Sequence, residues 1–241
     1  MITKNQIRFV KSLQQKKYRN ENRLFVVEGR KNVAEVFASD FVIQITYVSR
    51  LSELPDELAE YEEISSKDMD RISGLKSSPG ILSVVEMRDL AWDGSTKGLT
   101  IILDDIKDPG NLGTIIRSAN WFGVSRVICS KNTVDLWNPK VVQATMGAIF
   151  RVPIFYNTLE NVVEKMKDNN VPTFAAILDG ENLYDISFSD NLAIIIGSES
   201  HGISPEIIQQ ASNSVTIPSF GNAESLNASI ACAVILGVLR R

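Results

Sequence analysis

Alternating apolar segments in the second part of the chain constrain the fold more than any other feature of the sequence. Aliphatic, β-branched runs near residues 99, 126, 173, 192 and 214 alternate with helical patterns near residues 112, 140, 159, 205 and 226. Strands that are apolar throughout and separated by helices are typical of sheets covered on both faces. We therefore predict a mostly parallel sheet with helices on both of its faces.

The first part of the chain has a different pattern. A helical pattern over residues 7–13 is followed by a second one over 33–37, and strands are predicted over 41–48 and 81–85. The polar, turn-rich stretch 89–98 separates this part from the first apolar strand of the parallel sheet. The sequence therefore predicts two α/β domains, a small one over residues 1–95 and a larger one over residues 96–241.

Charge is unevenly divided between these two parts. Residues 1–31 contain nine Lys or Arg and two Glu, a net charge of +7, so the rest of the chain carries −11 of the total of −4. A local basic patch, more than the total charge, sets the field that a nucleic-acid phosphate meets. The stretch from Asp168 to Leu239 contains no Lys or Arg. This absence disfavours a phosphate-bearing cofactor there and favours a neutral or cationic one.

Composition narrows the class of protein further. Hydrophobic residues make up 44% of the 241 residues and charged residues 22%, which is typical of a globular protein. The sequence has neither a long apolar tract nor an apparent signal peptide, so we expect a cytoplasmic protein without a membrane partner. Cys129 and Cys232 lie in apolar runs without metal-ligand spacing, so we predict reduced core thiols and no metal site.

A first candidate loop follows the strand near residue 99. It runs from Asp104 to Gly113 and leads into a helix that carries Arg117. Loops at the carboxyl ends of parallel strands are where ligands bind in open α/β sheets. If Asn111 lies at the start of the helix, Arg117 lies nearly two turns further along, and its side chain is long enough to reach back towards the loop. The alternative is an ordinary Gly-Pro turn with Asn111 as the N-cap of the helix.

A second candidate loop, from Gly197 to Gly202, follows the apolar strand near residue 192 and carries Glu199. Glycines allow close approach of the backbone to a flat ligand. Because G-x-G-x-x-G is absent and no Lys follows, a dinucleotide or P-loop site is disfavoured. His201, the one histidine of the chain, has no partner visible in the sequence and is left out of the predicted site.

A third candidate loop runs from Ile217-Pro218 to Ser225-Leu226-Asn227 and opens a long apolar helix that ends near Leu239. Several small residues give this helix a narrow face that allows close packing. The alternative interpretation is a buried C-terminal helix capped by Ser225, which is compatible with a functional role for the same residue.

The three loops, in this order and each after a strand, resemble the signature motifs of the SpoU/TrmH family of RNA ribose 2′-O-methyltransferases in the SPOUT superfamily. The segment from Asn138 to Val142 that leads to Met146-Gly147-Ala148 is similar to the helix that lies between these motifs. Phe25 to Gly29 and Ser78 to Gly80 more weakly resemble the ribosomal-protein-like substrate domain of many members. The resemblance implies a deep C-terminal trefoil knot and a homodimer whose active site is completed across a two-fold interface.

The resemblance also implies site residues. S-adenosylmethionine is expected against the backbone of Gly197, Ile217, Pro218 and Leu226. The positions that match the catalytic ones of the family are Asn111, Arg117, Glu199, Ser225 and Asn227. A guanidinium stays protonated at neutral pH. We therefore expect Arg117 to hold a phosphate or stabilise the developing alkoxide, and the asparagines and Ser225 to orient the ribose and the arginine.

The function implied by the resemblance is methylation of a ribose 2′-hydroxyl in structured RNA. Ribosomal RNA is the first choice because of the N-terminal domain, and transfer RNA is the alternative. A non-catalytic, knotted RNA-binding dimer is a third interpretation, since a fold alone does not prove chemistry. The sequence does not indicate which nucleotide is methylated.

Overall fold

The computed structural model describes residues 2–54 and 60–241. The chain forms two compact units, each with its own core. The first holds Met1–Asp89 together with Asp135–Arg151, and the second holds Leu90–Val134 together with Val152–Arg241. The chain therefore passes between the units three times, where the predicted division at residue 95 has one crossing.

A four-stranded sheet forms the centre of the first unit, with the strand order β1-β4-β2-β3. The strands are β1 (Leu24–Glu28), β2 (Ile43–Val48), β3 (Glu62–Glu63) and β4 (Ile81–Glu86). β4 pairs antiparallel with both β1 and β2, whereas β3 is parallel to β2. Helices α1 (Lys4–Ser12) and α4 (Ser66–Ile72) cover one face, where Val10, Met69 and Leu82 share a core cluster. α2 (Lys16–Asn22) and the short η1 (Leu51–Glu53) complete the N-terminal part.

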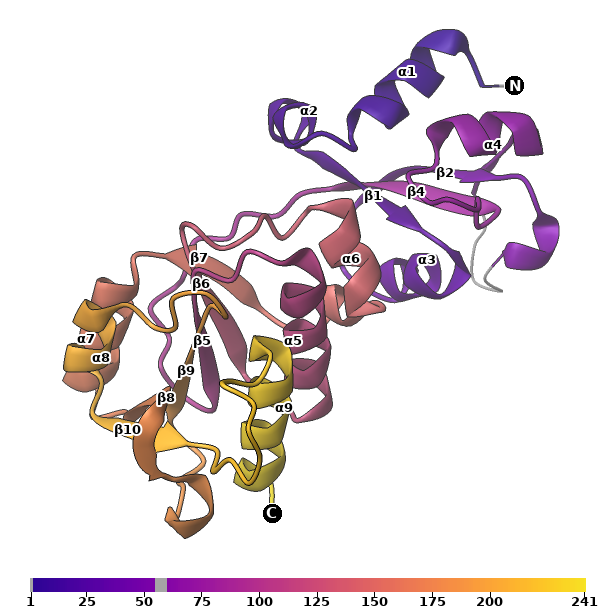
Figure 1. The fold of residues 1–241 in the computed structure, drawn as a ribbon. Helices are drawn as coiled ribbons and strands as arrows, with labels where there is room; N and C mark the ends of the chain where they lie inside the picture. Colours follow the sequence, from indigo (N-terminus) through magenta and orange to yellow (C-terminus); the bar gives the residue numbers. More distant parts are fainter. Residues whose placement is uncertain (1, 55–59) are drawn as a thin grey trace. The chain divides into compact units, whose positions relative to one another are not determined.

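The opposite face of this sheet is covered by α3 (Arg30–Phe37) and by the segment Asp135–Arg151, which contains α6 (Pro139–Thr145) and η2 (Ala148–Phe150) (Figure 1). Aromatic rings of the segment Asp135–Arg151 pack against aromatic rings of the N-terminal part of this unit. The ring centroids of Phe25 and Trp137 are 4.5 Å apart, and those of Phe41 and Phe150 are 5.2 Å apart. Residues from far along the sequence thus belong to the core of the first unit.

Arg19 anchors the same segment. Its side chain is 2% exposed, and its Nη1 donates to the carbonyl oxygens of Leu13 at 3.0 Å and Gln14 at 2.9 Å. Nη2 donates to Oδ2 of Asp135 at 2.6 Å. Although it lies in the basic N-terminal stretch, Arg19 is a buried structural cation and is not available to a nucleic-acid phosphate.

A six-stranded sheet with the order β10-β8-β9-β5-β6-β7 forms the centre of the second unit, and every neighbouring pair is parallel. This confirms the predicted parallel sheet. The strands are β5 (Thr100–Asp104), β6 (Arg126–Ser130), β7 (Ile154–Asn157), β8 (Thr173–Asn182), β9 (Ala193–Gly197) and β10 (Asn213–Thr216). The sequence patterns did not predict β7, a four-residue edge strand that directly follows Pro153.

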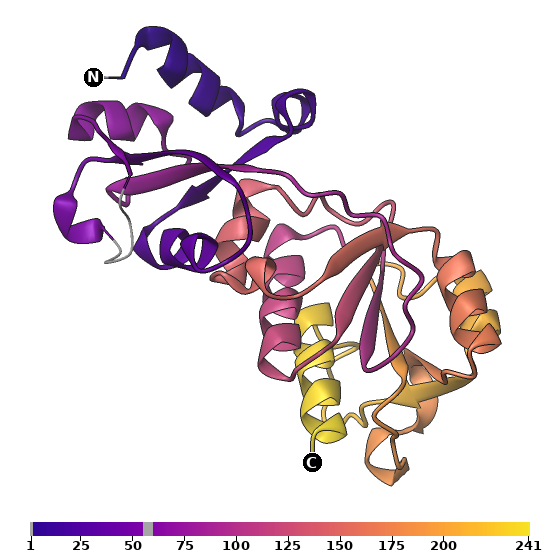
Figure 2. The ribbon, with the colours of Figure 1, turned by 180° about the vertical axis from the view of Figure 1, so that it is seen from behind.

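Helices cover both faces of this sheet, as predicted. α7 (Leu159–Asp168) and α8 (Pro205–Gln210) pack on one face, where Val162, Ile195 and Ile207 belong to one core cluster. α5 (Pro109–Trp121) and α9 (Ala228–Leu239) lie side by side on the other face (Figures 1 and 2). A short η3 (Leu183–Asp185) follows β8.

Two contacts set the direction in which α5 and α9 run. Asn227 at the start of α9 donates to Asn111 near the start of α5, and Nε of Arg240 after α9 donates to the carbonyl oxygen of Phe122 after α5 at 2.8 Å. The helices are therefore parallel, and their N-termini lie at the same end of the sheet. None of the helices in the described ranges is long and apolar enough to span a membrane. The knot implied by the family resemblance stays a prediction.

Candidate active site

The centre of the parallel sheet is where the direction of chain progression changes. From β5 the chain continues to β6 and β7 on one side of β5. The later strands β8, β9 and β10 lie on its other side, with β9 next to β5. Asp104 at the end of β5 is the register partner of Gly197 at the end of β9. Loops that leave the sheet at such a switch point diverge and open a crevice for ligands. The first and second candidate loops both begin here.

The loop after β5 starts α5 with Asp108, whose Oδ1 accepts from the backbone N–H of Asn111 at 2.8 Å. The prediction that Asn111 is the N-cap is therefore wrong. Pro109 occupies the first helical position, where its fixed φ and missing N–H are tolerated, so the cap is the residue before it. Asn111 lies at the third helical position, and its side-chain amide is left to contact other loops.

The loop after β9 folds back on itself directly after Gly197. Ser198 and Gly202 exchange two backbone hydrogen bonds of 3.1 and 2.9 Å. A Cβ at position 197 would lie 2.1 Å from the carbonyl carbon of Gly202, so only glycine fits there. Oδ2 of the buried Asp104 accepts from both the N–H and the hydroxyl of Ser204, at 2.8 and 2.6 Å. These contacts fix the loop with Glu199 at its tip.

Asn227, and not Ser225 as predicted, is the N-cap of α9. Its Oδ1 accepts from the N–H of Ser229 at 2.9 Å, from the Ser229 hydroxyl at 2.6 Å and from the N–H of Ile230 at 3.3 Å. Side-chain oxygens of Asn suit this role because they reach the second and third N–H groups of a helix. The cap leaves the Nδ2 group of Asn227 pointing away from the helix.

Asn111, Glu199 and Asn227 meet in one hydrogen-bonded cluster. Oε1 of Glu199 accepts from Nδ2 of Asn111, from Nδ2 of Asn227 at 3.3 Å and from the N–H of Ala228 at 3.3 Å. Nδ2 of Asn227 also donates to Oδ1 of Asn111 at 2.9 Å. A carboxylate is favoured here by the N-terminus of α9. Oε2 of Glu199 accepts no hydrogen bond from the part of the chain that is described.

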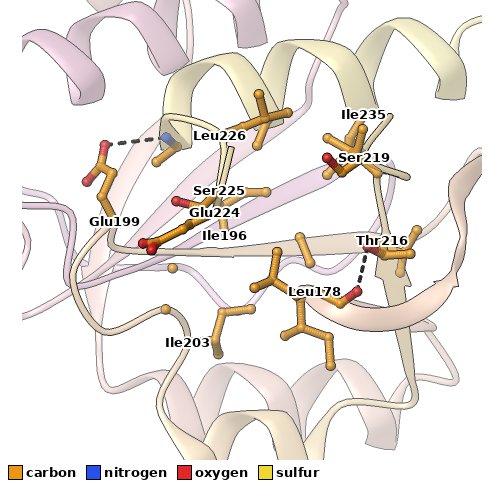
Figure 3. Close-up of a pocket in the computed structure, with 18 of the residues that line it drawn as sticks. Leu178, Ile196, Glu199, Ile203, Thr216, Ser219, Glu224, Ser225, Leu226 and Ile235 are labelled. Carbon is orange, nitrogen blue, oxygen red and sulfur yellow. Dashed lines mark hydrogen bonds between the residues drawn. The ribbon is translucent and has the colours of Figure 1, made fainter. Parts of the chain in front are cut away.

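A cavity of about 590 Å³ lies beside this cluster, at the carboxyl ends of β9 and β10 and against the middle of β8. Figure 3 shows the side chains around it, with Glu199 and Ser225 towards the start of α9 and Thr216 and Leu178 on the strands. The cavity is lined by all four residues predicted to contact a cofactor, Gly197, Ile217, Pro218 and Leu226. Two of the predicted catalytic residues, Glu199 and Ser225, also line it. Their roles stay predictions.

Arg117 does not join the cluster. It lies on α5 six residues after Asn111, which places it about 9 Å further along the helix axis. Its side chain is exposed and forms no hydrogen bond or ion pair with the residues that the structure describes. Four of the five predicted catalytic residues thus lie at or beside one cavity, and the fifth projects from the exposed side of α5.

The sequence of the parallel-sheet unit matches the model of the SpoU rRNA methylase family over residues 98–237, which is more than half of the chain. This chain belongs to the SpoU rRNA methylase family. Residues 4–83 match a second model, described as an MRM3-like substrate binding domain. The SpoU match includes the segment Asp135–Arg151, although that segment packs in the first compact unit.

Relatives of this SpoU family chain are similar over nearly its whole length. A 23S rRNA (guanosine(2553)-2′-O)-methyltransferase, RlmP, of Bacillus subtilis is 27% identical over 234 residues, which are 95% of this chain and 94% of the relative. A solved structure described as an RNA methyltransferase of the TrmH family from Porphyromonas gingivalis is 32% identical, with a TM-score of 0.90 over 100% of this chain and 98% of that one. An AdoMet-bound rRNA methyltransferase from Sinorhizobium meliloti is 27% identical, with a TM-score of 0.88 over 100% and 95%.

The structure adds residues to the cavity that the sequence did not identify. Glu224 and Phe220 line it from the third loop, and His201 lines it from the second, with its Nδ1 2.8 Å from the Ser200 hydroxyl. Phe220 is 94% exposed. The sequence could have indicated these three residues only by their position, because they lie in the second and third candidate loops, which follow predicted strands.

Both cysteines are free and buried in the second unit, as predicted. Burial in an apolar environment raises the pKa of the Cys232 thiol to about 12 and that of Cys129 further still. These thiols are therefore unreactive at neutral pH. Within residues 2–54 and 60–241 there is no group of three or more side chains suited to hold a metal ion.

Proposed function

We propose that this SpoU family chain transfers a methyl group from S-adenosylmethionine to a ribose 2′-hydroxyl of ribosomal RNA. The observation that carries the proposal is the apolar cavity whose rim bears the Asn111, Glu199 and Asn227 cluster. The relatives support the same reaction, since RlmP is a 2′-O-methyltransferase of 23S rRNA and the S. meliloti structure contains AdoMet.

The cavity suits the proposed cofactor in size and charge. About 590 Å³ lies within the range of small-molecule and cofactor sites. The described lining is mostly aliphatic, includes two carboxylates and contains no Lys or Arg, so a sulfonium is favoured over a phosphate. When bound, the cofactor supplies an electrophilic methyl group on positively charged sulfur. Backbone of Gly197, Ile217, Pro218 and Leu226 is proposed to hold it.

The side chains around the cavity are proposed to act by positioning. Asn111 and Asn227 hold Oε1 of Glu199, so the orientation of this carboxylate is fixed before any ligand binds. Ser225 lines the same cavity and is proposed to orient the ribose. Holding the 2′ oxygen in line with the reacting methyl removes most of the entropic cost of a two-reactant step. Arg117 is proposed to contact the target phosphate or to stabilise the negative charge that develops on the 2′ oxygen.

A two-fold homodimer is proposed to bring Arg117 to the cavity. The exposed sides of the parallel helices α5 and α9 carry Trp121, which is 83% exposed, and Ile230, which is 50% exposed. Arg117 precedes Trp121 by one helical turn, so both lie on the same side of α5. A second copy of this chain packed on this helix pair would bury the apolar side chains and place each Arg117 near the partner's site.

Mixed dimers test this arrangement directly. Arg117→Ala and Glu199→Gln variants are each expected to be inactive. If Arg117 serves the partner's site, a co-expressed 1:1 mixture contains heterodimers with one intact site, and about a quarter of wild-type activity returns. An inactive mixture whose subunits have exchanged would place Arg117 in the site of its own chain. Light scattering of Trp121→Glu, which is expected to be monomeric, tests the interface itself.

The first unit is proposed to bind the RNA through its exposed basic side chains. Lys4, Arg8, Lys11, Lys16 and Lys17 on α1 and α2 are all exposed. Such contacts to phosphates carry no sequence information but set affinity and its dependence on salt. Lys11→Gln with Lys16→Gln is expected to lower the slope of log affinity against log salt by about 1 for each contact removed. The cytoplasmic location expected from the sequence remains part of this proposal.

Methyl transfer itself is tested with tritiated S-adenosylmethionine and total RNA from a strain that lacks the modification, followed by mapping of the label. Label on a ribose of ribosomal RNA is the expected result. Label confined to transfer RNA would move the substrate to the alternative class. RNA binding without label on any RNA would favour the non-catalytic dimer and contradict the proposed reaction.

A further inference from the structure

The ionisable side chains of the cavity are unbalanced in sign. Glu199 and Glu224 line it together with His201, and no Lys or Arg is present in the described lining. The nearest stretches of chain do not compensate, because residues 168–239 contain no Lys or Arg. With a neutral histidine, the side chains that one chain contributes to the cavity therefore carry two formal negative charges and favour a cation.

The two carboxylates differ in how they are held. Oε1 of Glu199 accepts three hydrogen bonds, from Asn111, Asn227 and Ala228. Glu224 has neither a hydrogen bond nor an ion pair with any described residue, and its side chain is exposed. Figure 3 shows it projecting from the loop before α9, next to Ser225. Glu224 is thus a free carboxylate on the wall of the cavity. No hydrogen bond or ion pair with a described residue gives it a structural role.

The proposed reaction gives a free carboxylate here a specific use. S-adenosylmethionine carries a net charge of about +1, whereas the product S-adenosylhomocysteine has neutral sulfur and a net charge near zero. The two molecules otherwise share the same adenosine and amino-acid groups, and they differ by one methyl. Apolar contacts and backbone hydrogen bonds therefore bind both almost equally, and charge is the property that separates them.

We propose that Glu224 selects the sulfonium form of the cofactor over the neutral product. The inference rests on the proposed function, because it assumes that this cavity binds S-adenosylmethionine. A carboxylate within reach of the sulfonium raises affinity for the cofactor before methyl transfer and loses that attraction afterwards. The product then leaves more readily, and a new cofactor competes successfully for the same cavity.

Glu224 is a specificity residue and not a catalytic one. During methyl transfer the positive charge on sulfur disappears, so the carboxylate stabilises the bound cofactor at least as much as the transition state. Interactions of this kind lower KM without raising kcat. A Glu224→Gln variant is therefore expected to need more cofactor and to suffer stronger product inhibition, with kcat unchanged or slightly higher.

Calorimetry on the full-length protein tests the inference without reference to RNA. Three ligands are compared: S-adenosylmethionine, S-adenosylhomocysteine and sinefungin, in which a carbon bearing a protonated amine replaces the sulfonium centre. Glu224→Gln is expected to weaken the two cationic ligands about threefold to fivefold, the effect of one exposed ion pair, and the neutral product less than about twofold. Glu224→Asp, which keeps the charge, should retain part of the discrimination, and higher salt should reduce it.

Glu164→Gln is the matched control. Glu164 lies on α7 in the same unit, is exposed and does not line the cavity, so its loss changes the net charge equally without touching the ligand. Equal weakening of all three ligands by Glu224→Gln, or equal effects of both variants, would overturn the role assigned to Glu224 and leave the proposed function intact. Failure of the wild-type protein to bind S-adenosylmethionine would contradict the proposed function as well.

Discussion

Asn227 carries two tasks that substitution can separate. Its Oδ1 caps α9, while its Nδ2 donates to Asn111 at 2.9 Å and to Glu199 at 3.3 Å. Ser at the same position keeps a capping oxygen but has no amide to donate across the loops, and Ala has neither. Loss of a cap costs about 1 kcal/mol, which lowers Tm by about 2–4 °C in a chain of this size. We therefore expect that fall for Asn227→Ala and less than half of it for Asn227→Ser.

Activity is expected to follow the amide and not the cap. Both variants lose the donor that orients Glu199 and Asn111, so both should lose methyl transfer by about tenfold or more, because small displacements of positioning groups cost that much. The measurements are thermal unfolding and tritium incorporation into the RNA substrate, on the same preparations. Near-wild-type activity of Asn227→Ser, with loss in Asn227→Ala, would show that capping is the whole role of the residue and refute the assignment to the site.

Further predictions concern stability, thiol chemistry and the cavity. Asp135→Asn removes the carboxylate partner of the buried Arg19 and should cost about 3 kcal/mol, whereas Glu35→Gln at the more exposed pair with Arg151 should cost less than about 1 kcal/mol, both measured by thermal unfolding. Because burial raises the pKa of Cys232 to about 12 from 9.0, native protein should resist iodoacetamide at pH 9 and react only in urea. The unfolded thiol loses its proton first, so stability should fall as pH rises from about 9 towards 12, and less so in Cys232→Ala. Gly197→Ala should abolish cofactor binding in calorimetry, because the new Cβ overlaps the backbone of Gly202.

The parallel sheet and its three functional loops are predictable from the sequence because their signals are local. Each buried strand is a short apolar run, and each loop is the polar stretch that follows it. The cap of α5 is also local, since Pro109 at the first helical position identifies Asp108. The cap of α9 differs: Asn227 lies two residues after Ser225, and no feature of the surrounding residues shows which of the two is the N-cap.

The sequence does not show that the three loops contact one another in the folded protein. Asn111, Glu199 and Asn227 are separated by 88 and 28 positions, and their contact depends on the sheet placing β5 next to β9 and on α9 packing along α5. Glu224 has no sequence signal at all, because a charged residue in an exposed loop is the ordinary case. The role proposed for Glu224 depends on its position at the cavity, which exists only in the folded unit.

The packing of the segment Asp135–Arg151 in the first unit is also not predictable, since an apolar pattern does not indicate in which of the two cores a segment is buried. Trp137 and Phe150 look like part of the parallel-sheet domain in sequence, yet they pack with Phe25 and Phe41 of the first unit. The sequence-based division at residue 95 treats the two domains as separable. A chain that begins at residue 96 would keep this segment and lose Phe25, Phe41 and Arg19, which contact it in the first unit.

Removal of residues 1–95 is therefore expected to do more than abolish RNA methylation. Trp137, which is buried in the full chain, would become exposed together with Phe150, and Asp135 would lose Arg19. An exposed aromatic patch of this kind promotes association, so we expect aggregation of the shortened chain in light scattering. The same deletion with Trp137→Ser and Phe150→Ser should be more soluble and should bind S-adenosylmethionine in calorimetry. The opposite result would be a monodisperse deletion variant that lacks these substitutions and binds the cofactor with wild-type affinity. It would show that the parallel-sheet unit folds without the packing of Asp135–Arg151 in the first unit.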